Sequence, residues 1–335
     1  MNSSAIYVLS PENNRPSGGI KILYRHVDVL QRRGFSAAIL HQQPGFRCTW
    51  FANDTRVVYL PEVQLTERDF LVIPEIFGPN MFALSQLAQI GPRVKKVIFN
   101  QNCYYTFLGH PIDSVLHPEF KTPYEKSEEF VAAIVVSEDS KRYLEYTYPR
   151  LNVFRIHNAI NVDVFAYRRE KKPQICFMPR KHPEDALQVL AILRARNALR
   201  DFTVVPIDNK TEREVAAIMQ ESAIFMSFGY PEGCPLPPAE AMACGCIVVG
   251  YHGMGGAEYF KDEFSHTVSI NDIVGFARAM EVLIGEWHRD PEILLERGRW
   301  ASEYVRKTYS MQREEQDIVA VWNDLLGVNG APSHS

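Results

Sequence analysis

The chain has 335 residues, of which 46% are hydrophobic and 23% are charged, and its formal net charge is −4. This length predicts about two domains, each with a substantial hydrophobic core. The acidic balance argues against a dedicated nucleic-acid-binding protein, because such proteins carry a basic surface.

The first 160 residues alternate short apolar runs with helix-like segments. The expected strands are 5–10, 35–40, 56–60, 70–75, 94–100 and 132–137. Apolar residues recur at helical spacing in 18–34, and a second helix is expected over about 80–90. Strands that alternate with helices predict a parallel sheet that is covered on both faces.

The helix expected over 18–34 has a basic side. Lys21, Arg25, Arg32 and Arg33 lie on an otherwise apolar segment. We interpret these side chains as a solvated outer face. Attraction to an anionic membrane surface or to a phosphorylated acceptor is the alternative interpretation.

The second half of the chain repeats the alternation. The polar segment 158–174 is expected to be the linker. Strands are expected at 175–179, 202–207, 223–228 and 246–251, with helices at about 183–196 and 211–222. The region of about 271–326 is expected to be mainly helical. Two doubly wound units in tandem bind ligands outside the carboxyl ends of their strands.

Cysteine usage and hydropathy bear on the compartment. The six cysteines are scattered, without a CxxC pair or metal-ligand spacing, so we expect reduced and mostly buried thiols. The N-terminus lacks the basic region of a secretory signal, and no segment reaches the roughly 18 apolar residues of a membrane span. We therefore expect a cytoplasmic protein, with peripheral contact at the inner face of the membrane as an open alternative.

The stretch PEGCPLPPAEAMACGCIVVGYHG, residues 231–253, follows the strand expected at 223–228. Pro237 and Pro238 fit the start of a helix, and the free N–H groups of its first turn are expected to form a phosphate site. Glu240, placed in this first turn, can accept hydrogen bonds from a ribose. Glu232, on the loop before it, can reach another polyol. A phosphate flanked by two polyols is the shape of a nucleotide sugar.

This stretch resembles the E-x7-E signature of retaining GT-B glycosyltransferases, particularly glycosyltransferase family 4. The matching positions are Glu232, Gly233, Leu236, Pro237, Glu240, Ala241, Met242, Ala243 and Gly245. The resemblance implies that Glu232 contacts the donor sugar and Glu240 the ribose, while the backbone from Cys234 to Pro237 approaches the pyrophosphate. Cys234 and Pro235 replace the customary Phe-Gly, and Pro235 removes an N–H group.

The resemblance extends over most of the chain. Gly18 and Gly19 match the family's N-terminal glycine loop, which lets the backbone approach the donor phosphate or the acceptor. A simple turn after the first strand is the alternative interpretation.

Residues 175–190 resemble the strand, loop and helix that carry a basic pair on the donor phosphates. Arg180 matches the family arginine, whereas Asp185 stands where the family has a lysine. Lys181 or His182 is the candidate replacement for that cation. For His182 and Asp185 we prefer the interpretation of an exposed helix start.

Gln101 and Asn102 follow the strand 94–100, where family members often carry a histidine that contacts the donor sugar. Amide side chains can bind sugar hydroxyl groups by hydrogen bonds, but they cannot act as a base near neutral pH. Tyr104, with Tyr105 and Phe107, is expected either to form an acceptor platform or to pack in the core.

The expected fold is therefore α/β, of the GT-B type. It has two Rossmann-like doubly wound domains that face a cleft, with C-terminal helices crossing back. The expected acceptor domain is 1–160 and the expected donor domain is 161–305. Residues 306–335 are expected to form a helix that returns to the first domain, followed by a tail.

The resemblance implies retaining transfer of a sugar from a nucleoside diphosphate sugar to a hydroxyl group, without a metal or another cofactor. Glu232, Arg180 and Lys181 are the expected catalytic residues, with orienting and electrostatic roles. The expected acceptor is a glycan, a lipid-linked molecule or a small molecule, in polysaccharide or surface-glycan synthesis, and no nucleic acid is expected. A sugar-nucleotide epimerase, a sugar phosphorylase and a degenerate sugar-nucleotide-binding protein remain open alternatives.

Overall fold

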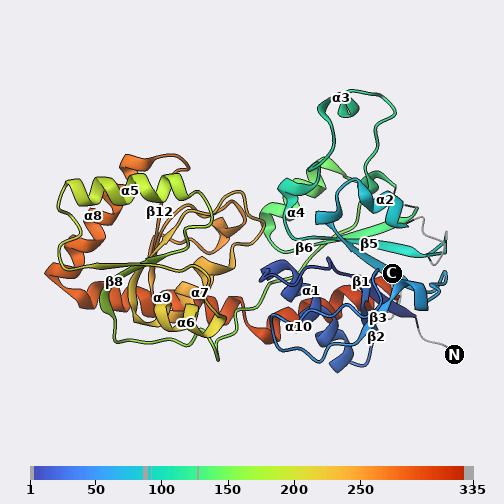
Figure 1. Cartoon of the computed structure of the whole chain (residues 1–335), viewed down its shortest axis with the longest axis horizontal. Coiled ribbons are helices and arrows are strands. Elements are labelled where there is room, and N and C mark those ends of the chain that lie inside the picture. The colour runs from blue at the N-terminus through green and yellow to red at the C-terminus, as the bar shows by residue number, and fades with distance from the viewer. Residues whose placement is uncertain (1–3, 86–89, 92, 127, 328–335) are drawn as a thin grey trace, which may run out of the picture. The chain divides into compact units, whose positions relative to one another are not determined.

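The computed structural model describes residues 4–85, 90–91, 93–126 and 128–327. Contacts within the chain divide it into two units, shown in Figure 1. The first unit comprises Met1–Asn158 and Glu314–Ser335, and the second comprises Ala159–Arg313. The chain therefore passes between the units at 158/159 and at 313/314, whereas the sequence-based bounds were 160/161 and 305/306.

The first unit is built on a seven-stranded sheet with the order β3-β2-β1-β4-β5-β6-β7. Its strands, all in parallel pairs, are β1 (Ala5–Leu9), β2 (Ser36–His41), β3 (Val57–Tyr59), β4 (Phe70–Pro74), β5 (Lys95–Asn100), β6 (Phe130–Val135) and β7 (Val153–Arg155). The strand order reverses between β1 and β4. Ligands of such sheets bind at the carboxyl edge beside this reversal.

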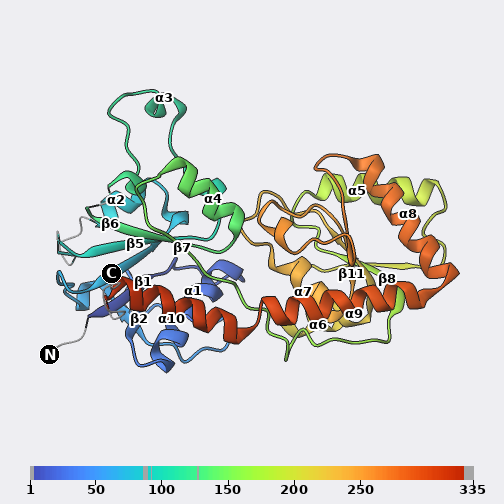
Figure 2. The same ribbon diagram turned by 180° about the vertical axis from the view of Figure 1, so that it is seen from behind.

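The helices of the first unit are α1 (Gly18–Arg32), α2 (Asn80–Ser85), α3 (Ile112–Val115), α4 (Glu138–Thr147) and α10 (Met311–Leu325). The short α3 lies on an extended loop and not on the sheet (Figure 1). The part of the expected helix 80–90 that comprises 86–89 lies outside the described residues. Figure 2 shows α10 beside α1, and Trp322 Nε1 of α10 donates to His26 Nε2 of α1 at 2.8 Å.

The basic side of α1 is only partly the solvated outer face that we preferred from the sequence. Arg32 and Arg33 are exposed, as that interpretation expects, although Arg33 also pairs with Glu315. The interpretation is wrong for Arg25, which lies 2.7 Å from the buried Glu314 of α10.

The second unit contains a five-stranded parallel sheet with the order β12-β11-β10-β8-β9. The strands are β8 (Lys172–Phe177), β9 (Thr203–Pro206), β10 (Ser222–Ser227), β11 (Ile247–Gly250) and β12 (Ser265–Thr267). The helices are α5 (Pro183–Ala195), α6 (Glu212–Glu221), α7 (Leu236–Cys244), α8 (Ile273–Arg289) and α9 (Pro291–Thr308). One apolar cluster joins α5 and α8 to the sheet, and the other joins α6, α7 and α9.

The segment 158–174, expected to be a linker, is packed into the second unit. Ile160 and Phe165 are each 2% exposed and belong to the apolar cluster under α7. Lys172 already begins β8. The chain does pass between the units within this segment, at 158/159, but the rest of the segment belongs to the second unit, where these apolar side chains pack.

The structure bears on two further expectations, the state of the cysteines and the absence of a membrane-spanning helix. All six cysteines are free, and each except the half-buried Cys234 is buried, so the expectation of free and mostly buried thiols is confirmed. Within the described ranges, no helix combines the length and apolar character that a membrane span requires.

Candidate active site

Two loops at the carboxyl edge of the second sheet carry most of the predicted donor-site residues. One loop follows β8 and precedes α5, and the other follows β10 and precedes α7. β8 and β10 are parallel neighbours, with Phe177 opposite Met226. The carboxyl ends of parallel neighbours share one edge, so the two loops emerge side by side.

An ion pair between Lys181 of the first loop and Glu232 of the second links these two loops. Lys181 Nζ lies 2.7 Å from Glu232 Oε1, and the two side chains are 36% and 26% exposed. The Glu232 backbone is held on both sides, because its N–H donates to Gly253 O at 2.8 Å and its carbonyl accepts from Gly255 N–H at 3.0 Å. A Cβ atom on Gly255 would overlap the Gly233 carbonyl, so this close approach requires glycine.

Arg180 lies in the same loop as Lys181. Its side chain is exposed, and it forms no hydrogen bond or ion pair with any described residue. The loop therefore presents one cation that is paired with Glu232 and one that is available to an anionic ligand.

His182 and Asp185 have defined contacts. The His182 ring stacks on Tyr230 with centroids 4.2 Å apart, and its Nε2 is 2.8 Å from the Tyr230 carbonyl oxygen. Tyr251 donates its hydroxyl proton to Asp185 Oδ2 at 2.9 Å. A helix does start at Pro183, but the expectation of exposed side chains is wrong, because both are half-buried against the neighbouring strand ends.

The start of α7 differs from the phosphate site that we expected. The helix begins at Leu236, so Pro235, Pro237 and Pro238 occupy three of the four positions whose N–H groups are free in an ordinary helix. Leu236 supplies the one N–H among these four positions. The expectation of several free N–H groups is wrong, because the helix starts one residue before the proline pair.

Glu240 and the loop before α7 complete the predicted donor-site residues. Glu240 is half-buried and lies beyond the first turn of α7, not within it. Gly233 is buried and Cys234 is half-buried. Pro235 is held by its carbonyl oxygen, which accepts a hydrogen bond from the buried Tyr259 hydroxyl. The loop is therefore fixed by the fold.

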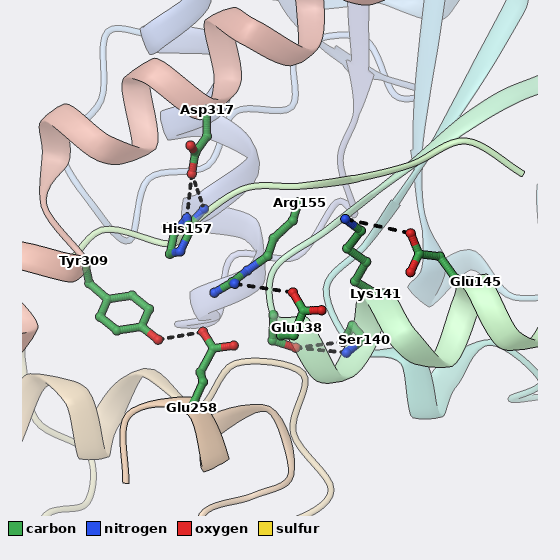
Figure 3. Close-up of polar contacts among 10 residues, drawn as sticks. Glu138, Ser140, Lys141, Glu145, Arg155, His157, Glu258, Tyr309 and Asp317 are labelled. Carbon is green, nitrogen blue, oxygen red and sulfur yellow. Dashed lines mark hydrogen bonds and ion pairs between the residues drawn. The ribbon is translucent and has the colours of Figure 1, made fainter. Parts of the chain in front are cut away.

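The glycine-rich turn after β11 is tied to the end of α9. Tyr309 donates to Glu258 Oε1 at 2.6 Å, as Figure 3 shows, and Tyr304 donates to the Glu258 carbonyl at 3.1 Å. His252 Nδ1 accepts a hydrogen bond from Met254 N–H at 3.0 Å, so this ring nitrogen stabilises the loop that carries it.

In the first unit, Gly18 and Gly19 are the first two residues of α1. Gln101 follows β5, and its Nε2 donates to the Gly19 carbonyl at 3.2 Å. Gln101 and the adjacent Gly18 and Gly19, all predicted site residues, therefore lie together at the carboxyl edge of the first sheet.

Asn102 and Tyr104 are used within the first unit. Asn102 is 5% exposed, and its side-chain oxygen accepts from Tyr104 N–H at 3.2 Å. Tyr104 donates its hydroxyl proton to Asp139 Oδ2 at 3.0 Å, and burial is the main cause that raises the pKa of Tyr104. Both residues help to fold the segment that carries Gln101.

Glu75 was not predicted from the sequence. It follows β4 directly and is 4% exposed, and hydrogen bonding by backbone N–H groups, those of Gln101 and Asn102 among them, acts to lower the pKa of its carboxyl group. An acidic residue immediately after the buried strand FLVIP was the signal that could have identified it. Among the described residues, no group of three or more His, Cys, Asp or Glu side chains is arranged to hold a metal ion.

Comparisons with known proteins connect this edge of the second sheet with sugar transfer. A model of the family described as Glycosyl transferases group 1 matches residues 179–286, which include Arg180, Lys181, Glu232 and Glu240. An alpha-1,6-glucosyltransferase from Actinobacillus pleuropneumoniae serotype 7 (strain AP76) is 29% identical over 272 residues, covering 78% of this chain and 75% of that protein.

Solved structures share the architecture. Sucrose-phosphate synthase from Thermosynechococcus elongatus matches with a TM-score of 0.66 at 14% identity, covering 97% of this chain and 100% of that chain. HepE from Anabaena in complex with UDP-glucose matches with a TM-score of 0.64 at 13% identity, covering 96% and 99%. The expected α/β fold with two Rossmann-like units is confirmed.

Proposed function

We propose that this chain, a glycosyltransferase with the GT-B fold, moves a hexosyl group from a nucleoside diphosphate sugar to a hydroxyl acceptor with retention of anomeric configuration. The matched family, the glucosyltransferase relative and the fold support sugar transfer in glycan synthesis. Retention is proposed because the E-x7-E spacing of Glu232 and Glu240 resembles that of retaining enzymes.

The contact between Lys181 and Glu232, at 2.7 Å, is the observation that carries this proposal. It places a cation beside the motif glutamate although the family's lysine position holds Asp185. In our proposal, Lys181 and Arg180 bind the donor diphosphate and offset the charge that develops as it leaves. Glu232, released from Lys181, then orients the donor sugar.

UDP-glucose is the donor that we propose first. The relative from Actinobacillus pleuropneumoniae is named a glucosyltransferase, and HepE was solved with UDP-glucose. In this assignment Glu240 binds the ribose, while Gly233, Cys234, Pro235 and Leu236 line the pyrophosphate. Among Pro235, Leu236, Pro237 and Pro238, only Leu236 can donate a backbone hydrogen bond at the start of α7. Side-chain cations therefore carry more of the phosphate binding than in an ordinary helix-terminus site.

We propose that the first unit binds the acceptor through the edge that carries Gly18, Gly19 and Gln101. The Gln101 amide can bind a sugar hydroxyl group, and it cannot remove a proton near neutral pH. The departing phosphate oxygen is therefore the proposed base. The proposed reaction needs no metal ion, since Lys181 and Arg180 provide the positive charge.

The first experiment measures thermal stabilisation of the purified protein by UDP, GDP, dTDP, ADP and CMP compounds, with their common sugars. We expect selective stabilisation by UDP compounds that is lost in Glu240→Ala and kept in Asp262→Ala, an exposed residue of the same unit. Absence of stabilisation by every nucleotide in the folded protein would contradict the proposal.

Two further measurements test the mechanism. Proton NMR of the purified product should show, at the new glycosidic linkage, the same anomeric configuration as in the donor. Activity should survive excess EDTA, and a loss that magnesium or manganese restores would contradict metal independence.

We also propose a cytoplasmic setting with peripheral contact at the inner face of the membrane. Free and mostly buried thiols are typical of a reducing compartment. Figure 1 shows α3 on an extended loop of the first unit, and Ile112 and Leu116 on this loop are 80% and 77% exposed. Co-sedimentation with lipid vesicles should weaken in the Ile112→Asp/Leu116→Asp variant, and equal co-sedimentation would contradict the membrane contact.

A further inference from the structure

Glu75 is a buried carboxyl group at the carboxyl edge of the first sheet. It follows β4, which lies between β1 and β5, and it is 4% exposed. The loop after β1 leads to Gly18 and Gly19, and the segment after β5 begins with Gln101. Glu75 is thus located where the strand order reverses, between the two segments that carry the predicted contact residues of this unit.

The contacts of Glu75 lead to Gln101. The backbone N–H groups of Gln101, Asn102, Ile76 and Glu75 itself act on its carboxyl group by hydrogen bonding and lower its pKa, while its Oε2 is buried and has no hydrogen-bond partner in the described part of the chain. The Gln101 side chain donates to the Gly19 carbonyl at 3.2 Å. A continuous set of contacts therefore runs from Glu75 through Gln101 to the start of α1.

Glu75 lacks a charged partner. No described lysine, arginine or histidine forms an ion pair with it, and burial raises its pKa to about 7, although the backbone N–H groups oppose this shift. The titratable side chain close enough to interact with its charge is Tyr124, whose hydroxyl oxygen accepts from Asn100 Nδ2 at 2.7 Å. Both protonation states of Glu75 are accessible near neutral pH, and the ionised carboxylate is the stronger acceptor.

We propose that Glu75 is a positioning residue for sugar transfer, which holds the backbone of Gln101 and Asn102 so that the Gln101 amide meets a hydroxyl group of the reacting sugar. This proposal rests on the proposed function, since it assigns Gln101 a contact with sugar. In this proposal Glu75 itself does not touch substrate, because its side chain is buried. Ionisation of Glu75 strengthens the hydrogen bonds that its carboxylate accepts from this backbone, so kcat for sugar transfer should rise with pH.

The test compares kcat for glucose transfer from UDP-glucose in four variants. These are Glu75→Gln, Gln101→Ala, the double variant, and Glu62→Gln as a control at an exposed position of the same unit. At about pH 8, Glu75→Gln should lower kcat about tenfold, which corresponds to the loss of one charge-assisted hydrogen bond, with the Kd for UDP unchanged. Because Glu75 acts through Gln101, the double variant should be no slower than Gln101→Ala alone.

A pH series separates positioning from general structural damage. The ratio of wild-type kcat to that of Glu75→Gln should fall from about ten near pH 8 towards one near pH 6. Amide hydrogen exchange in the segment 98–107 should be faster in Glu75→Gln than in Glu62→Gln at the higher pH.

Additive losses in the double variant, a kcat ratio that does not change with pH, or unchanged amide exchange would each overturn the role of Glu75. These outcomes are read in an active wild-type enzyme. A wild-type protein that neither binds UDP compounds nor transfers sugar would instead overturn the proposed function.

Discussion

Lys181 lies four positions before Asp185, which stands where the resemblance placed a lysine. The structure gives each residue a different partner, with Lys181 on Glu232 and Asp185 on the Tyr251 hydroxyl. A lysine at 185 could not accept the hydrogen bond that the Tyr251 hydroxyl donates. The substitution is therefore consistent with the cation having moved along the loop, from the first turn of α5 to the residue that faces the motif glutamate.

Lys181→Gln should lower kcat/KM for UDP-glucose about 100-fold, because it removes a positive charge from the proposed diphosphate site. Lys181→Arg should retain part of the activity, since it keeps the charge. Initial rates over a range of donor concentrations provide the measurement. Lys210→Gln is the matched control, because Lys210 lies near the start of α6 in the same unit and pairs only loosely, at 3.9 Å, with Glu214. A Lys181→Gln variant as active as this control would refute the assignment.

Asp185→Ala should lower the free energy of unfolding of the second unit by about 1 kcal/mol, because the Tyr251 hydroxyl loses its acceptor. Tyr251→Phe should have a similar cost. The loss in the double variant should be smaller than the sum of the single losses, since both substitutions remove the same hydrogen bond. Urea unfolding of the four proteins measures this coupling, and strictly additive losses would show that the bond contributes nothing.

At the scale of elements, the longer strands were predictable because each contains a continuous buried apolar run. β7 and β12 were missed because their three residues, VFR and SHT, form no continuous apolar run, unlike the VVY of the equally short edge strand β3. The start of α7 was also misjudged. Proline is compatible with several early helix positions, so the sequence pattern could not decide that Leu236 comes first.

The candidate site was predictable where it depends on local spacing. The eight-residue separation placed Glu232 on a loop and Glu240 on the helix that follows it. The partners of these residues were not predictable, because Lys181 and Glu232 are brought together by the pairing of β8 with β10. The same holds for Glu75 and Gln101, which meet because β4 pairs with β5.

The contact between α1 and α10 depends on an uncharged histidine. His26 is fully buried, and burial lowers its pKa from 6.5 to about 3. As pH falls below 6.5, the unfolded chain takes up a proton at this position before the folded protein does. The free energy of unfolding should therefore fall between pH 6.5 and about 3, by at most about 1.4 kcal/mol per pH unit.

His26→Gln isolates this contribution, since a glutamine oxygen can still accept from Trp322 Nε1 and does not titrate. The difference in unfolding free energy between wild type and variant should be constant above pH 6.5. Below that pH, the wild type should lose stability relative to the variant. Urea unfolding at a series of pH values tests this, and parallel curves throughout would show that His26 does not control the pH response.

At the scale of the whole molecule, the C-terminal segment contributes to both units. Tyr309 donates to Glu258 and accepts from Ile160 N–H through its carbonyl oxygen, within the second unit. Asp317 accepts from the backbone N–H of His157 and lies 2.6 Å from its Nδ1, within the first unit (Figure 3). Hydrogen bonds within each unit therefore hold the residues next to the two points, 158/159 and 313/314, where the chain passes between the units.

Because α10 belongs to the first unit, a change in its buried face should destabilise that unit selectively. Trp322 is fully buried, so Trp322→Ala should lower the free energy of unfolding of the first unit by about 3–5 kcal/mol. The second unit has its own two apolar clusters and should keep its transition, so calorimetry should resolve two transitions in place of one broad transition. Gln316→Ala, at an exposed position of the same helix, should leave the profile unchanged. If Trp322→Ala instead shifts a single transition as a whole, the two units unfold cooperatively. In that case, UDP that binds the second unit should also protect α10 from unfolding.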